Sequence, residues 1–160
     1  MKIQEVMTAN PLWCLPEDAS IQAARIMREL NVDIVPVVKS RTDHRLVGVV
    51  TDRDLCLGVV AMNQHPHAVP VQKCMTTITI ACQPDEDIQR AAALMEENQM
   101  HRIPVVDQRG ILHGIVSAAD ICRQSHLSSD FHTSHPHKGH GVDLPHLPTP
   151  DLSRINLPNE

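Results

Sequence analysis

The residues best suited to chemistry are a hydroxyl and a carboxylate that stand three positions apart at two places in the chain. Thr51 and Asp54 lie in "GVVTDRDL", and Ser117 and Asp120 lie in "GIVSAADI". In both places an apolar, β-branched strand pattern precedes the hydroxyl, and a helical pattern follows it. A Ser or Thr at a helix N-cap with an acidic residue three positions later forms a capping box. The two pairs are therefore explained as helix caps without any ligand.

The same geometry also suits a nucleoside phosphate. A helix N-terminus carries free N–H groups and a partial positive charge, which favour a phosphate. The cap hydroxyl can donate to that phosphate, and the carboxylate can accept from the two vicinal hydroxyls of a ribose. Arg53 adds a cation to the first corner, where the second corner has alanine. Capping and binding are compatible, because one hydroxyl can serve the empty helix and then the ligand.

The two corners belong to a tandem repeat. A shift of the chain by 68 residues superimposes the same residue types in the same order, and after a gap of two residues the corners coincide as well. Each copy predicts the order β-α-β-β-α over about 55 residues, which is too little to be stable alone, so the copies must pack together. The matched positions include Met7 and Met75, Cys14 and Cys82, Pro16 and Pro84, and Met27 and Met95.

The hydrophobic pattern predicts the elements of each copy. A short apolar stretch, at 12–15 or 78–82, precedes a turn. Apolar residues at helical spacing predict a first helix, β-branched runs predict a hairpin, and a second helix begins near Asp52 or Ala118. The helical positions are Ala23, Ile26, Met27 and Leu30 in copy one and Ile88, Ala91, Ala92 and Met95 in copy two. The hairpin strands are expected at 33–39 and 46–51, and at 102–107 and 111–117.

Composition marks the borders of the repeats. The stretch 63–70 has two prolines and no periodicity, and it separates repeat 1 (1–62) from repeat 2 (71–124). Residues 125–160 hold five of the twelve prolines and six of the eleven histidines, which predicts a tail that is disordered or docked in extended form. These histidines are candidate ligands for a transition metal. Because proline and glycine interrupt them without a fixed geometry, we expect a solvated tail and no metal site.

These motifs together resemble a known family. The Met-Thr start, the Ala-Ala helix, the "PVV" strand and the repeated G-h-V-[TS]-x-x-D pattern are similar to a pair of cystathionine-β-synthase (CBS) domains, a Bateman module, over residues 3 to 124. The resemblance implies an α/β (α+β) fold of two β-α-β-β-α repeats, packed through their sheets with pseudo-twofold symmetry. It also implies that the clefts bind AMP, ADP, ATP or S-adenosylmethionine, and that the module forms a homodimer.

The resemblance extends to individual residues. Thr51 and Asp54 match the phosphate and ribose contacts of one cleft, and Ser117 and Asp120 match those of the other. "HRIP" at 101–104 is similar to a segment of the AMP-activated kinase gamma subunit in which the His and Arg reach nucleotide phosphates. The further predicted ligand-binding positions are Arg53, Ile34, Val35 and Pro36 in the first copy and His101, Arg102, Ile103 and Pro104 in the second.

The two sites are expected to differ. The first-copy equivalents of His101 and Arg102 are Asp33 and Ile34, so the first copy lacks this cationic contribution. A base would rest between aliphatic side chains and use backbone groups near the two "PV" strands, because no aromatic residue stands nearby.

Composition argues against several other functions. The chain has one Trp, one Phe, no Tyr and a net charge of −5, without a basic cluster that would neutralise nucleic acid. No apolar run approaches the roughly 18 residues of a membrane span. The start shows no secretory signal. We therefore expect no nucleic-acid or membrane partner and a cytoplasmic location.

The thiols and histidines do not suggest catalysis. The five cysteines include no CxxC pair, and Cys56 and Cys122 have apolar neighbours that predict burial. No His stands in a recognisable nucleophile–base arrangement. We expect a non-enzymatic sensor that needs no cofactor and passes a ligand-induced change to an effector protein. The alternative is a ligand-independent dimerisation or scaffold module whose corners are only helix caps.

Overall fold

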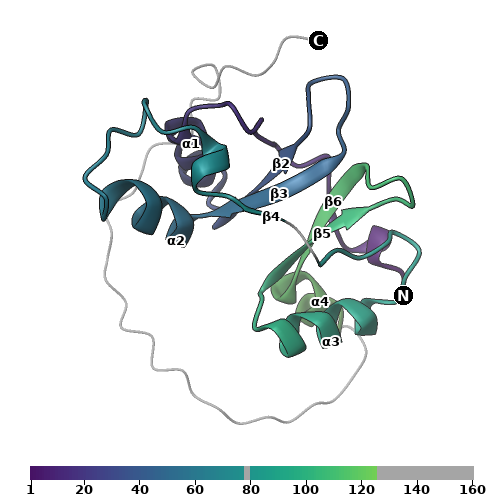
Figure 1. Ribbon diagram of the computed structural model, residues 1–160. Helices are drawn as coiled ribbons and strands as arrows, with labels where there is room; N and C mark the ends of the chain where they lie inside the picture. Colours follow the sequence, from purple (N-terminus) through teal and green to yellow (C-terminus); the bar gives the residue numbers. More distant parts are fainter. Residues whose placement is uncertain (78–79, 126–160) are drawn as a thin grey trace, which may run out of the picture.

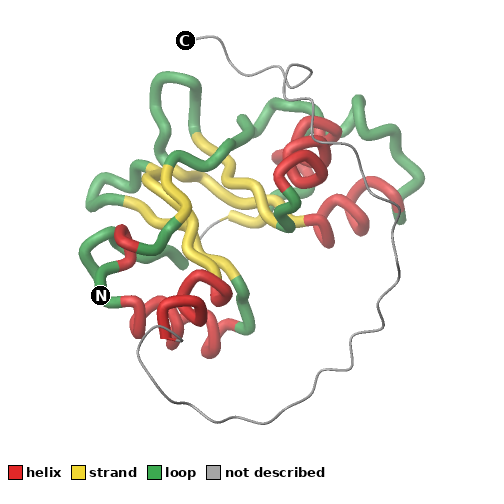
Figure 2. The backbone as a smooth tube through the Cα atoms, turned by 180° about the vertical axis from the view of Figure 1, so that it is seen from behind, coloured by secondary structure: helices red, strands yellow, loops and turns green. Residues whose placement is uncertain are grey.

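The protein is built from two similar halves around two small sheets. The computed structural model describes residues 1–77 and 80–125. Figure 2 shows the strands in the middle of the molecule and the helices toward its outer sides. The predicted α/β (α+β) fold of two β-α-β-β-α repeats is confirmed. From residue 126 onward, the tail predicted for 125–160 lies outside the described residues.

Each half has a helix, a β-hairpin and a second helix. None of the helices among the described residues is both long enough and apolar enough to cross a membrane. The first half contains α1 (Ser20–Leu30), β2 (Ile34–Val38), β3 (Leu46–Thr51), α2 (Asp52–Leu55) and the π-helical turn η2 (Cys56–Val60). The second half contains α3 (Ile88–Asn98), β5 (Arg102–Val106), β6 (Leu112–Ser117) and α4 (Ala118–Ser125). Shorter elements are η1 (Ile3–Glu5), β1 (Thr8–Ala9), η3 (Val71–Lys73) and β4 (Thr76–Thr77).

The apolar faces predicted for the first helices are confirmed at most positions. Ala23 and Met27 of α1 are buried in the core of the first half. Ala91 and Met95 of α3 occupy the same places in the second core. Leu30, in the last turn of α1, is 42% exposed. The helical period of about 3.6 residues thus places one stripe of each helix against its hairpin.

The first part of the segment ahead of each first helix, which contains η1 and β1 or η3 and β4, lies on the opposite half of the molecule. The strand orders are β1-β6-β5 and β2-β3-β4, so β1 joins the sheet of repeat 2 and β4 joins the sheet of repeat 1. Ile3 is fully buried in the second core, and Val71 is fully buried in the first. In Figure 1 the N-terminus accordingly lies beside α3. Each half therefore completes its core with a segment from the other copy.

The leading strands differ from the prediction. Pairing occurs earlier in the chain, in β1 and β4, and Cys14 and Cys82 make only single parallel bridges to the hairpins. Each cysteine amide donates to a strand carbonyl and each cysteine carbonyl accepts from that strand. The next donor in this parallel ladder would be Pro16 or Pro84, which has no N–H, so pairing stops. The stretches concerned are 12–15 and 78–82, of which 78–79 lie outside the described residues.

The two hairpins meet near the pseudo-twofold axis. Arg45 and Ile111, which are equivalent in the repeat, form an antiparallel bridge. The amide of Leu46 donates to the carbonyl of Gly110 at 2.9 Å, and the amide of Leu112 donates to the carbonyl of His44 at 3.0 Å. These reciprocal bonds join the two sheets and support the pseudo-twofold symmetry that the resemblance implied.

Gly114 permits β1 to approach β6, and its replacement is expected to destabilise the fold. A Cβ at this position would lie 2.9 Å from the carbonyl oxygen of Thr8 and 2.5 Å from the sulfur of Met7. We expect Gly114→Ala to lower the free energy of unfolding by about 2 kcal/mol, because the backbone of β1 must move. Chemical denaturation measures this change. The exposed neighbour His113→Ala is the control, and equal effects of the two substitutions would contradict this explanation.

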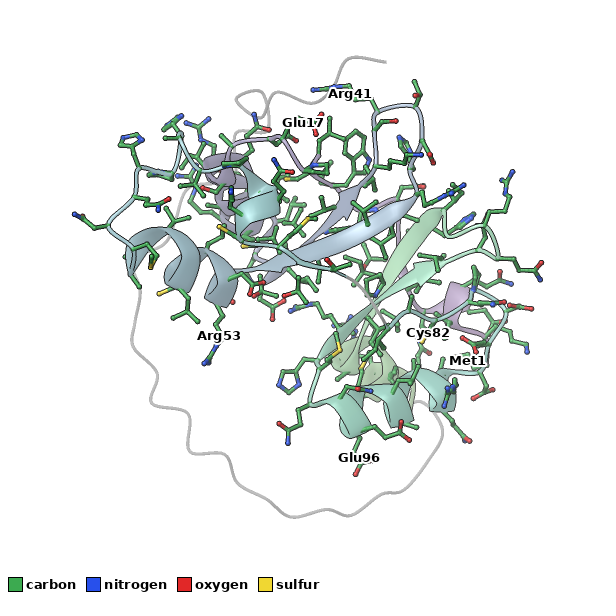
Figure 3. All side chains as sticks on the ribbon, in the orientation of Figure 1. Met1, Glu17, Arg41, Arg53, Cys82 and Glu96 are labelled. Atoms are coloured by element: carbon green, nitrogen blue, oxygen red, sulfur yellow. The ribbon has the colours of Figure 1, made fainter. Side chains whose placement is uncertain are left out.

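The cysteines divide into buried and exposed pairs. Cys14 and Cys82 are buried, as predicted, and Figure 3 shows Cys82 within the second half. Cys56 and Cys122 are exposed, so the predicted burial of these two is wrong. Their apolar neighbours bury a different face of each helix, since successive helical residues are rotated by about 100°.

Thiol alkylation should follow this division. Burial, with a smaller contribution from Asp18, raises the pKa of the Cys14 thiol to about 12. Burial, with a smaller contribution from Glu86, raises the pKa of Cys82 to about 11. Because the thiolate is the reactive form, we expect Cys56 to react with iodoacetamide in the folded protein while Cys14 and Cys82 react only after denaturation. Peptide mass spectrometry measures the rates, and equally fast labelling of Cys14 would contradict the prediction.

Candidate functional site

Both hydroxyl–carboxylate corners form the capping box that the sequence predicts. At the second corner the amide and hydroxyl of Ser117 donate to Asp120 Oδ2 at 2.9 and 2.6 Å, and the amide of Asp120 donates to Ser117 Oγ at 3.1 Å. Thr51 and Asp54 make the same three bonds at 2.9, 2.8 and 3.1 Å. The corners are therefore complete without a ligand, and each has a hydroxyl and a carboxylate at the start of a helix.

The hairpins hold the two corners in place. The first amide of α2, from Asp52, donates to the carbonyl of Asp33 at 3.0 Å, and the first amide of α4, from Ala118, donates to the carbonyl of His101 at 2.9 Å. The carboxylate of Asp52 also accepts from the amide of Arg53 at 2.7 Å. Ala118 has no carboxylate that could accept a hydrogen bond from the equivalent amide, that of Ala119. The second corner therefore has the less acidic helix start.

Ser117 and Asp120 open onto a cleft of about 230 Å³, which we call the Ser117 cleft. Its walls come from both repeats, with aliphatic side chains from the first and most of the polar groups from the second. This volume lies just below the roughly 300–1,000 Å³ that is usual for small-molecule sites. The lining residues are Thr8, Pro11, Leu12, Ile26, Leu30, Val32, Ile34, Arg102, Ile115, Ser117, Ala119, Asp120 and Arg123.

The structure brings four of the predicted ligand-binding residues together in this cleft. They are Ile34 from β2, Arg102 at the start of β5, Ser117 at the end of β6 and Asp120 in α4. Ile34 comes from the other repeat, so an adenosine compound that contacts these four residues would bridge the two halves. The cleft combines an aliphatic wall, a cation, a hydroxyl and a carboxylate, which is a suitable combination for a nucleotide.

Five other predicted positions lie elsewhere. The side chains of Val35, Pro36, Ile103 and Pro104 are fully buried in the two cores. The carbonyls of the two prolines already accept from the amides of Cys14 and Cys82. His101 is exposed and lines a separate hollow of about 460 Å³ between α3 and α4.

The first corner has different surroundings. Asp54 lines a hollow of about 620 Å³ formed with η2 and the segment that leads to η3. Arg53 extends from the start of α2 into open space (Figure 3). Pro11 lines the Ser117 cleft, and its repeat equivalent, residue 79, lies outside the described residues. We therefore describe the Ser117 cleft as the candidate site and keep Thr51 and Asp54 as predicted positions.

The ion-pair partners of Arg102 and Asp120 were not predicted from the sequence. Asp33 of the first repeat forms an ion pair with Arg102 of the second. Arg123 forms an ion pair with Asp120 Oδ1. The spacing of Arg123 three residues after Asp120 on a helix could have indicated their pairing. Nothing in the sequence could have indicated that Asp33 faces Arg102, because these residues meet only when the two repeats pack.

The fold and the paired corners define a duplicated α/β module with a cleft of about 230 Å³ that is lined by both repeats. The family model for the CBS domain matches residues 3–60 and 62–126. The chain therefore belongs to the CBS domain family, which confirms the resemblance. One relative, the uncharacterized protein YlbB of Bacillus subtilis (strain 168), is 35% identical over 120 residues, or 75% of this chain and 79% of YlbB.

Two similar solved structures contain adenosine compounds. The crystal structure of CBSX2 in complex with AMP is 26% identical, with a TM-score of 0.67, and the match covers 79% of this chain and 97% of CBSX2. The CBS domain pair of protein MJ0100, in complex with 5′-methylthioadenosine and S-adenosyl-L-methionine, is 25% identical, with a TM-score of 0.68. That match covers 78% of this chain and 99% of the MJ0100 chain. Both structures have the fold described above.

Proposed function

We propose that the protein is a regulatory module that binds an adenosine compound in the Ser117 cleft. The observation that carries this proposal is the grouping of Ser117, Asp120, Arg102 and Ile34 in one cleft of about 230 Å³. The complexes of CBSX2 with AMP and of MJ0100 with adenosyl ligands support the choice of ligand class. AMP, ADP, ATP and S-adenosylmethionine are the candidate ligands.

Each group in the cleft has a role in this proposal. The carboxylate of Asp120 accepts hydrogen bonds from the ribose hydroxyls, and the hydroxyl of Ser117 turns from Asp120 to a phosphate oxygen. The amide of Ala119 and the guanidinium of Arg102 add donors for the phosphate. The adenine lies against the aliphatic wall that includes Ile34. Thr51 and Asp54 form a second, weaker site, since their helix start is more acidic.

The ligand would act by changing how the two repeats sit together. Ile34 and Arg102 come from different repeats, so one bound molecule contacts both. A ligand that prefers one arrangement of the repeats shifts the population toward it. We propose that a separate effector protein detects this arrangement and that the module itself catalyses no reaction.

We also propose a homodimer in the cytoplasm. The side chains of Leu57, Val60 and Met62 are large, apolar and exposed on and after η2, which supports a protein-facing surface there. None of the five cysteines, all of which lie in the described part of the chain, forms a disulfide bond, which is typical of a reducing compartment.

Isothermal titration calorimetry with AMP, ADP, ATP and S-adenosylmethionine tests the proposal. We expect at least one of them to bind and to raise the melting temperature, because a ligand that binds only the folded state stabilises it. No heat and no thermal shift with any of the four would reject the sensor. The scaffold alternative would then hold, and the complete capping boxes at both corners already favour it as the second candidate.

A further inference from the structure

Two charged side chains of the Ser117 cleft, Arg102 and Asp120, are each already neutralised by an ion pair. Arg102 is paired with Asp33, and Arg123 is paired with Asp120. The side chain of Arg102 is 29% exposed, whereas that of Asp33 is 48% exposed, so the carboxylate is the partner more open to solvent. The phosphate-binding cation of the proposed site is therefore already occupied, and the residue that occupies it comes from the opposite repeat.

We infer that Asp33 competes with the ligand phosphate for Arg102 and thereby lowers the affinity of the cleft for adenosine compounds that carry a phosphate, while leaving its affinity for adenosine unchanged. This inference rests on the proposed function. A phosphate monoester is an anion that can accept two parallel N–H bonds from a guanidinium, so it can take the place of the Asp33 carboxylate. A ligand without a phosphate offers no such replacement and leaves the ion pair intact.

Arg123 does not take over the role of Arg102. Asp120 Oδ2 already accepts two bonds from Ser117, and Arg123 contacts the remaining oxygen, Oδ1. A ribose must approach this same oxygen. The Arg123 side chain is 71% exposed, so it can leave Asp120 for solvent at little cost. Arg102 is therefore the cation whose ion-pair partner, Asp33, affects the affinity for a ligand phosphate.

The exchange also links ligand recognition to the packing of the repeats. Asp33 directly precedes β2, and its carbonyl holds the first amide of α2 at 3.0 Å. Its carboxylate is tied to Arg102 of the other repeat. A phosphate that removes Arg102 breaks one ion pair between the repeats and releases the carboxylate beside the first corner. A ligand lacking phosphate fills the cleft without this change.

The test compares AMP with adenosine, which differ only by the phosphate. Calorimetry gives both dissociation constants for the wild-type chain, Asp33→Asn, Arg102→Gln and the double variant. We expect Asp33→Asn to raise the affinity for AMP about five- to tenfold and to change that for adenosine by less than about twofold. Arg102→Gln should lower the affinity for AMP about tenfold, and Asp33→Asn should have no further effect in that background.

Asp85→Asn is the matched control. It removes one carboxylate from an exposed turn that does not line the cleft, so it reports the effect of net charge alone. Thermal unfolding checks that every variant is folded, and the Asp33 carbonyl keeps its backbone bond in Asp33→Asn.

The possible negative results lead to different conclusions. The inference is overturned if Asp33→Asn leaves the AMP affinity unchanged, or changes AMP and adenosine equally, while AMP still binds. Tight binding of S-adenosylmethionine with no binding of AMP would also overturn it and leave the sensor standing. No binding of any adenosine compound by either the wild type or Asp33→Asn would reject both.

Discussion

Asp120→Ala is expected to lower the affinity for AMP about 100-fold, which corresponds to the loss of two charge-assisted hydrogen bonds from ribose hydroxyls. Among the described residues, Asp120 is the one carboxylate that lines the Ser117 cleft, and Ser117 holds it through two hydrogen bonds. Alanine removes the acceptor and leaves the aliphatic wall and Arg102 in place. Calorimetry with AMP measures the loss.

The other corner supplies the control. Asp54→Ala removes the same capping carboxylate from α2, and it should change the affinity of the Ser117 cleft for AMP by less than about threefold. Each variant should lower the free energy of unfolding by about 1 kcal/mol, because each loses a helix cap. If Asp54→Ala weakened AMP binding as much as Asp120→Ala, the Ser117 cleft would not be the main site.

Ile3→Ala is expected to cost about 3 kcal/mol of the free energy of unfolding, a large effect for a residue so near a chain end. Ile3 is fully buried in the core of the second half, together with Ile103 and Val116. The amide of Ile3 also donates to the carbonyl of Glu86 at 2.9 Å, which ties this segment to the turn before α3. Chemical denaturation measures the change.

Two further measurements separate this explanation from a general effect of the terminus. Gln4→Ala, at the exposed neighbouring position, should change the free energy of unfolding by less than about 0.5 kcal/mol. In Ile3→Ala, amide hydrogen exchange should accelerate in α3 and β5 before it does in α1 and β2. Faster exchange confined to α1 and β2 would show that the N-terminal segment belongs to its own repeat.

Much of each repeat was predictable from local pattern. The β-branched runs lie close to the observed hairpin strands, and the second helices begin at Asp52 and Ala118 as predicted. The hydroxyl and carboxylate of each corner are three residues apart, so their bonds follow from the geometry of a single helical turn.

Other features of the candidate site depend on contacts between distant segments. Ile34 and Arg102 line one cleft because the two repeats pack against each other. Asp33 faces Arg102 across 69 positions of sequence. The predicted burial of Cys56 is wrong, because apolar neighbours along a helix do not indicate which face of the helix meets the core.

The amino-acid sequence by itself determined the duplication, the order of elements in each copy and the two capped helix starts, because these depend on residues within a few positions of one another. Only the tertiary structure decided that β1 and β4 change places between the halves and that one cleft combines groups from both repeats. The physical reason is that one repeat buries too little apolar surface to be stable alone. Each half therefore closes its core with a segment of the other, and the same packing creates the Ser117 cleft.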